Sequence, residues 1–180
     1  MTIQEPDRVL YKRRKYELVS ADSDGLFDPE QLDLELQPPH TACWSGYIAT
    51  YVVKYGGLLL RDLDCWIDPD SPPPPIGGHL PADANEWGEL AYTKLEIPMP
   101  YTGQLILGGG EILGSFSYGL DWSIYELVHE LHFEQGHLVE AIDRSAEAAQ
   151  RRSPAVRTLT RLKKQLDAIG EHLPDLERKR

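Results

Sequence analysis

Two adjoining stretches, residues 42–55 and 58–63, are dense in hydrophobic positions and have a glycine pair between them. Aromatic and β-branched residues dominate the first stretch, as is typical of strands that lie half-buried in a sheet. Gly56 and Gly57 supply the positive φ that a tight turn between antiparallel strands needs. The pattern therefore predicts a central β-hairpin, on which the other elements pack.

Shorter runs of the same kind predict further strands on both sides of this hairpin. Residues 9–11 and 16–19 flank the basic turn 12–15 and form an N-terminal hairpin. We interpret the basic turn as a hydrated hairpin tip in preference to a nucleic-acid or partner patch, because like charges in a run are usually solvated. Residues 87–95 and 103–107 provide two later strands.

Glycine and proline mark the connections. Residues 20–40 are polar and rich in turn formers, with one helical turn predicted at 29–32. The segment 68–78 contains four consecutive prolines and must leave the sheet as a stiff surface loop, a spacer rather than an SH3 ligand. Gly108-Gly109-Gly110 lacks the lysine and the serine or threonine of a phosphate-binding loop, so we interpret it as a turn between strands.

The segment 124–140 holds three of the six histidines and allows two interpretations. His129, His132 and His137, with Glu130, offer imidazole and carboxylate ligands for a metal ion. Their spacing is not the His-Glu-x-x-His pattern of helical zinc sites, and on a strand residues 129 and 132 point to opposite faces. We favour a β-hairpin with its turn at 134–137 and expect no cofactor.

Near residue 141 the composition changes, and alanine, arginine and glutamate become frequent. Residues 141–152 predict a helix, and Ser153-Pro154 is a good start for a second one. Leu159, Leu162, Leu166 and Ile169 recur at helical spacing until Gly170, so this second helix has an apolar stripe. The stripe packs on its own domain, pairs with a second chain as a homodimer, or docks on another protein.

Together these elements predict an α+β fold that is mainly β. The expected architecture is an antiparallel sheet, a meander or half-barrel of hairpins, followed by a C-terminal helical segment. We divide the chain into a β-rich domain at 1–140 and a helical segment at 141–180.

Composition and net charge limit the classes of partner and the cellular location that we expect. The chain has 29 acidic and 18 basic residues among 180, a formal charge of −11, which disfavours nucleic acid and anionic membranes and suits a basic protein. Cys43 and Cys65 are expected as buried free thiols, or as neighbours across the central hairpin. The start of the chain has no secretory pattern and no apolar run is long enough to span a membrane, so we expect a cytoplasmic protein.

Several motifs resemble a family of small uncharacterised bacterial proteins. The most specific is Trp44-Ser45-Gly46-Tyr47-Ile48-Ala49-Thr50, a Trp-x-Gly-Tyr-Ile-Ala-Thr strand, and a second is the hairpin motif Phe133-Glu134-Gln135-Gly136. The similarity extends over residues 9–140. This chain departs from the family in its prolines at 72–75 and in its helical tail. The resemblance implies a compact β-rich bacterial domain and no particular chemistry.

Three classes of function remain. We favour a non-enzymatic protein-binding module, such as an immunity protein or inhibitor of a bacterial conflict system, because no catalytic motif is present. The alternatives are a metal-dependent hydrolase with Glu130 as base, drawing a further ligand from His40 or His79, and a structural subunit that oligomerises through its C-terminal helix. The aromatic residues expected to bind a partner are Trp44, Tyr47, Tyr51, Trp66, Trp87, Tyr118 and Trp122.

Overall fold

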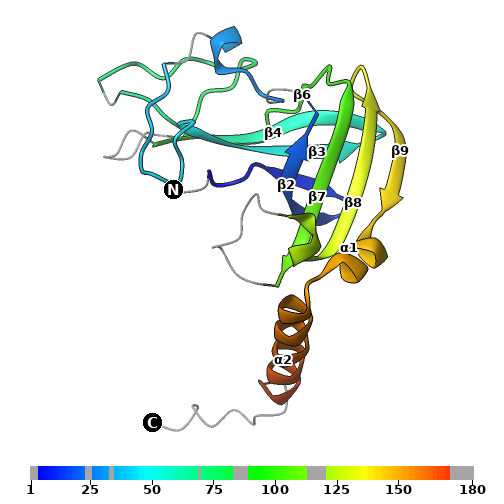
Figure 1. Cartoon of the computed structure of the whole chain (residues 1–180). Helices are drawn as coiled ribbons and strands as arrows, with labels where there is room; N and C mark the ends of the chain where they lie inside the picture. The colour runs from blue at the N-terminus through cyan, green and yellow to red at the C-terminus, as the bar shows by residue number, and fades with distance from the viewer. Residues whose placement is uncertain are drawn as a thin grey trace, which may run out of the picture.

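The computed structural model describes residues 4–22, 26–32, 35–68, 70–82, 89–112 and 121–170 (Figure 1). It consists of a large, mostly antiparallel sheet followed by a short helical segment, which confirms the predicted mainly β fold class. In chain order the elements, with η for a 3-10 helix, are β1 (Arg8–Tyr11), β2 (Arg14–Ala21), η1 (Pro29–Leu32), β3 (Tyr47–Lys54), β4 (Gly57–Trp66), β5 (Glu89–Tyr92), β6 (Ile97–Pro98), β7 (Gly103–Glu111), η3 (Trp122–Ile124), β8 (Tyr125–Glu134), β9 (His137–Asp143), α1 (Ser145–Arg151) and α2 (Pro154–Gly170).

The three hairpins predicted from the residue pattern are confirmed. Strand β1 pairs with β2, β3 with β4, and β8 with β9, all antiparallel. Each turns on two residues of positive φ, namely Lys12-Arg13, Tyr55-Gly56 and Gln135-Gly136, which suits the right-handed twist of the strands. The central turn lies one residue earlier than predicted, because Tyr55 adopts a left-handed conformation and Gly57 already pairs with Lys54.

Strand β9 continues past the point where a helix was predicted. Residues 141–143 pair with residues 129–131 of β8, and α1 begins only at Ser145. The prediction of a helix from residue 141 was therefore wrong at its start, because pairing with β8 outweighs the helix propensity of alanine. The Ser145 hydroxyl accepts a hydrogen bond of 3.0 Å from the backbone N–H of Val128, which ties α1 to the sheet.

The sheet curves back on itself. Its pairings follow the order β3-β1-β2-β7-β8-β9-β4, and β4 pairs with β3 again, so these strands form a closed circuit in the described chain. The weakest step is between β4 and β9, where Gly57 and His137 are the one registered pair. Figure 1 shows the consequence, with β3 and β4 running across the direction of β7 and β8. Strands β5 and β6 add to β4 outside the circuit.

The two faces of the sheet bury different cores. The inner face holds the main core, in which Tyr51, Leu63 and Leu131 are fully buried. The outer face of β2, β7 and β8 holds a smaller core beneath α1 and η3. Its buried members are Ile106, Ile124, Tyr125, Val128 and Ala148.

The triple glycine lies inside strand β7 and is not a turn, so that prediction was wrong. Aromatic rings explain the glycines: a Cβ on Gly108 would lie 2.6 Å from the ring of Tyr125, and a Cβ on Gly109 would lie 2.8 Å from the ring of Tyr16. The Tyr125 hydroxyl donates a hydrogen bond of 2.6 Å to Glu17, which holds its ring over the strand. The glycines therefore make room for one aromatic ring on each face of β7.

Replacing Gly108 with alanine is expected to lower the free energy of unfolding by about 1–2 kcal/mol, because the added methyl group forces the Tyr125 ring away from the strand. Urea denaturation of both proteins measures the change. Gly57→Ala is the matched control, since its Cβ meets only the Lys54 carbonyl at 3.5 Å. Equal stability of the two variants would contradict the packing explanation.

Helix α2 projects away from the sheet in Figure 1. Arg152 and Ser153 are its whole connection to α1. Leu162 of the predicted stripe is 49% exposed, and the side chains of Leu159, Leu166 and Ile169 lie outside the described residues. Among the described residues, no helix is long and apolar enough to cross a membrane.

Candidate functional site

The histidines of β8 and β9 do not gather at one point. His129 lies on the inner face, with its ring centroid 5.5 Å from that of Tyr11 and 5.3 Å from that of Tyr16, and burial lowers its pKa. His132 lies on the outer face, and His137 is exposed at the start of β9. Within the described ranges, no three histidine, cysteine, aspartate or glutamate side chains form a group able to hold a metal ion.

His132 instead belongs to a charged network between β8 and α1. Glu130 contacts His132 Nε2 at 2.6 Å through one carboxylate oxygen and Arg144 Nε at 2.8 Å through the other. Glu147 then joins Arg144, at 3.2 Å, to Arg151, at 2.6 Å. The network borders a hollow of about 360 Å³, which is also lined by Ser20, Gln104, Ile106 and Trp122.

The charges of this network are matched. The hydrogen bond from Arg144 is the largest cause of the lowered pKa of Glu130, so this carboxylate stays ionised and is a poor proton donor. Arg151 also lies over the Trp122 ring, 4.6 Å from its centroid. We therefore interpret the network as a set of ion pairs that stabilises the packing of α1 on the sheet. Its spacing of residues 144, 147 and 151 is visible in the sequence, but its pairing with β8 is not.

The aromatic residues expected to bind a partner are dispersed. Tyr51 lies in the main core with no exposed surface. Tyr47 is half-buried, with its ring centroid 5.0 Å from that of Phe27, and burial raises its pKa to about 12. Trp122 lies under Arg151, whereas Trp87 and Tyr118 lie outside the described residues. Their role in binding stays a prediction.

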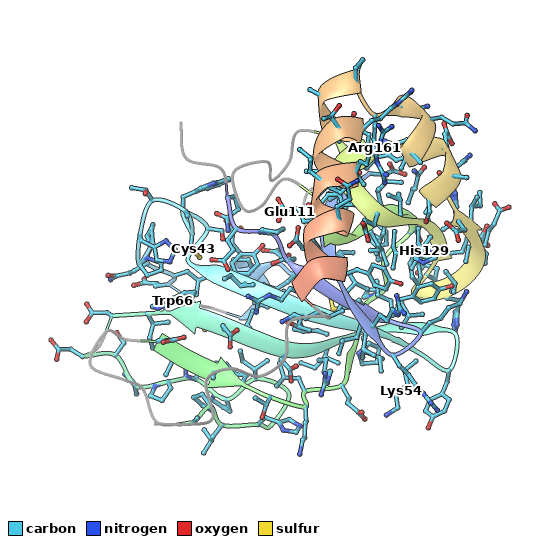
Figure 2. The ribbon with its side chains drawn as sticks, turned by 90° about the horizontal axis from the view of Figure 1, so that it is seen from below. Cys43, Lys54, Trp66, Glu111, His129 and Arg161 are labelled. Carbon is cyan, nitrogen blue, oxygen red and sulfur yellow. The ribbon has the colours of Figure 1, made fainter. Side chains whose placement is uncertain are left out.

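Trp44 and Trp66 do lie at the same end of the sheet. Trp44 is 64% exposed, and it comes two residues before Gly46, whose carbonyl accepts the backbone N–H of Trp66 at 3.0 Å. The ring of His40 is 6.4 Å from that of Trp66, edge to face. Figure 2 shows Trp66 and the neighbouring Cys43 together at one end of the molecule.

Two carboxylates lie beside Trp66 in the register of the strands. Asp64 lies two residues before Trp66 on the outward side of β4, between buried neighbours, and Glu89 of β5 is the registered partner of Trp66. Arg8 bridges Asp64, at 3.8 Å, and Glu5, at 3.5 Å. Burial is the main cause of the raised pKa of Asp64, and Glu89 adds to it. The Trp44 patch is the set of His40, Trp44, Trp66, Glu5, Asp64 and Glu89.

The loop that carries Trp44 is held from both sides. Glu5 donates its backbone N–H to the carbonyl of Ala42 at 2.6 Å, and Gln4 Oε1 accepts the N–H of Ser45 at 3.2 Å. Within the loop, Cys43 donates to the His40 carbonyl at 3.0 Å. Trp44 is thus a large exposed side chain on an anchored backbone, a combination typical of binding hot spots.

A largely buried carboxylate lies close to this loop and was not expected from the sequence. Asp7 precedes β1 and accepts the backbone N–H of Ala49 at 2.8 Å. Burial raises its pKa from 3.8 to about 6, against the opposing effects of that hydrogen bond and of Arg8. Local sequence gives no signal for this contact, because Asp7 and Ala49 meet only when β1 pairs with β3.

Both cysteines are buried, and neither forms a disulfide bond. Cys43 lies in the anchored loop, and Cys65 lies in β4 opposite Tyr47. Burial raises the pKa of both thiols, that of Cys65 to about 12. Neither thiol is therefore suited to act as a nucleophile, since the reactive form of cysteine is the thiolate.

Comparison with protein-family models, curated proteins and solved structures finds no match to this chain.

Proposed function

We propose that the protein is a non-enzymatic binding module that holds a basic protein partner on the Trp44 patch. The observation that carries the proposal is the exposed indole of Trp44 on a loop fixed by hydrogen bonds to Gln4 and Glu5. An immunity protein or an inhibitor that neutralises a basic enzyme works in this way. The module needs no bound group and no reacting residue of its own.

Two physical effects support this function. The net charge of −11 draws a basic protein toward the chain at long range, which raises the rate of association. At close range, Trp44 and Trp66 supply apolar area, and Glu5, Asp64 and Glu89 add carboxylates to the same patch. An aromatic anchor within a charged rim is the usual composition of a protein interface.

The test compares three baits in a lysate of the cells that make the protein: the wild type, Trp44→Ala and Tyr55→Ala. Tyr55 is the matched control, because it is 96% exposed at the turn between β3 and β4, away from the patch. We expect quantitative mass spectrometry to find a basic protein captured by the wild type and by Tyr55→Ala, with the affinity for Trp44→Ala reduced about tenfold or more.

Thermal unfolding of the three baits provides the second reading, and equal melting temperatures are expected because both side chains are exposed. Capture that is independent of Trp44, or the absence of any specifically captured protein, would contradict the proposed function.

A further inference from the structure

The charge of the chain is divided unevenly between its two parts. Residues 1–151, which end with α1, contain 25 acidic and ten basic side chains, whereas α2 (Pro154–Gly170) contains four basic side chains and one acidic one. The sheet with α1 is therefore strongly acidic, and the segment that includes α2 is basic. A basic amphipathic helix joined to an acidic body has its complementary surface within the same sequence.

In the described part of the chain, α2 makes no extensive contact with the sheet, and of its described side chains Thr160 is buried. The helix projects from the sheet in Figure 1, and Arg161 and Leu162 are exposed. The connection of two residues to α1 fixes where it starts. Figure 2 places Arg161 on the helix and Trp66 at a separate end of the sheet, so α2 does not reach the Trp44 patch of its own chain.

We propose that α2 of one molecule docks on the Trp44 patch of a second copy. In this arrangement the basic helix, on which Arg161 and Leu162 are exposed, lies against the carboxylates of Asp64 and Glu89 and against the indole of Trp44. The inference rests on the proposed function in one respect, since it uses the same patch. It assigns to that patch a specific ligand, a basic amphipathic helix with a row of leucines.

Charge distinguishes this arrangement from a pair of α2 helices. Two α2 helices side by side bring like charges together, because positions 157, 161, 163 and 164 are all basic. Docking on the patch brings opposite charges together. Two reciprocal contacts about a twofold axis also close the assembly and double its area toward the roughly 1,200–2,000 Å² of a stable interface.

The experiment measures the mass of the full chain by light scattering and its dissociation constant by analytical ultracentrifugation at low salt. We expect a dimer whose dissociation constant rises at least tenfold in Arg161→Glu/Lys164→Glu, and equally in Asp64→Lys/Glu89→Lys. The chain that combines all four substitutions restores the opposite charges and is expected to dimerise again. Lys12→Glu/Arg13→Glu, which alters the charge as much at an exposed turn, is the control that leaves the mass unchanged.

Three results would overturn the inference: a wild-type monomer at about 100 µM, a dimer that depends on α2 but not on the patch, or no recovery in the combined variant. Failure of the proposed function has a different signature. Capture of a basic protein through Trp44 by a monomeric chain would support that function and reject the helix as ligand. A dimer that depends on both surfaces, without any captured protein, would support the helix and reject the separate partner.

Discussion

Replacing Gly136 with alanine is expected to lower the free energy of unfolding by about 3–4 kcal/mol. The residue has a φ of 80°, where an added Cβ costs about 1–2 kcal/mol, and that Cβ would press on the backbone carbonyl of Met99. Backbone cannot turn aside as a side chain does. Gly136 also donates to the Tyr101 carbonyl at 2.8 Å and accepts from the Leu58 N–H at 2.8 Å, so any shift disturbs the join between β8, β9 and β4.

Gly56 provides a matched control for this prediction. It occupies the same second position of a two-residue hairpin turn with a φ of 75°, but a Cβ there meets no atom within 4 Å. Gly56→Ala should therefore cost only the conformational strain, about 1 kcal/mol. Chemical denaturation of both variants measures the two costs. A similar loss in both would show that the contact with Met99 adds nothing.

The second large effect is expected from Asp7→Asn, which should raise the free energy of unfolding by about 2 kcal/mol at pH 7.5. Burial raises the pKa of Asp7 from 3.8 to about 6, so the folded chain binds this proton more tightly than the unfolded chain does. The folded state therefore loses stability as the pH rises from about 4 through 6. Two pKa units correspond to about 3 kcal/mol, and partial contact of Asp7 with solvent reduces that figure.

Asparagine removes the charge and keeps an oxygen that accepts the N–H of Ala49. Unfolding curves at pH 3.5 and pH 7.5 test the sign: the two proteins should be equally stable at the lower pH, and the variant should be more stable at the higher one. Asp7→Ala is the control, because it also removes the charge but leaves the Ala49 N–H without its acceptor. A variant that is less stable than the wild type at pH 7.5 would show that the structure favours the ionised carboxylate.

Local features of the fold were readable in the sequence. Each hairpin depends on residues close to its turn, such as Gly56 or Gly136, and the alternation in β8 correctly separated His129 from His132. The prediction of a turn at the triple glycine was wrong for a physical reason. The glycine positions are small because Tyr16 and Tyr125, distant in sequence, pack on them, and no neighbouring residue reports that contact.

In the site, too, local features can be predicted from the sequence, whereas contacts between distant residues cannot. Aromatic residues on a binding surface are expected to be exposed. Trp44 is exposed, as expected. The assembly of Trp66, Asp64 and Glu89 around the same end of the sheet depends on the pairing of β4 with β5, across a loop of more than twenty residues. Asp7 next to Ala49 depends on the parallel pairing of β1 with β3. Such contacts are properties of topology and not of local composition.

The strand topology also determines the order in which strand pairs can form during translation. The β1–β2 hairpin forms from the first residues to be made, but the second neighbour of β2 is β7, so one edge of the hairpin lacks its partner until residues 105–108 have left the ribosome. The circuit of strands closes only when Gly57 of β4 pairs with His137 of β9. Folding is expected to be slow and to finish late in translation, because nonlocal strand pairing dominates. Lys12 and Arg13 form the turn of the β1–β2 hairpin, and their charges are expected to oppose the pairing of its open edge with other nascent chains.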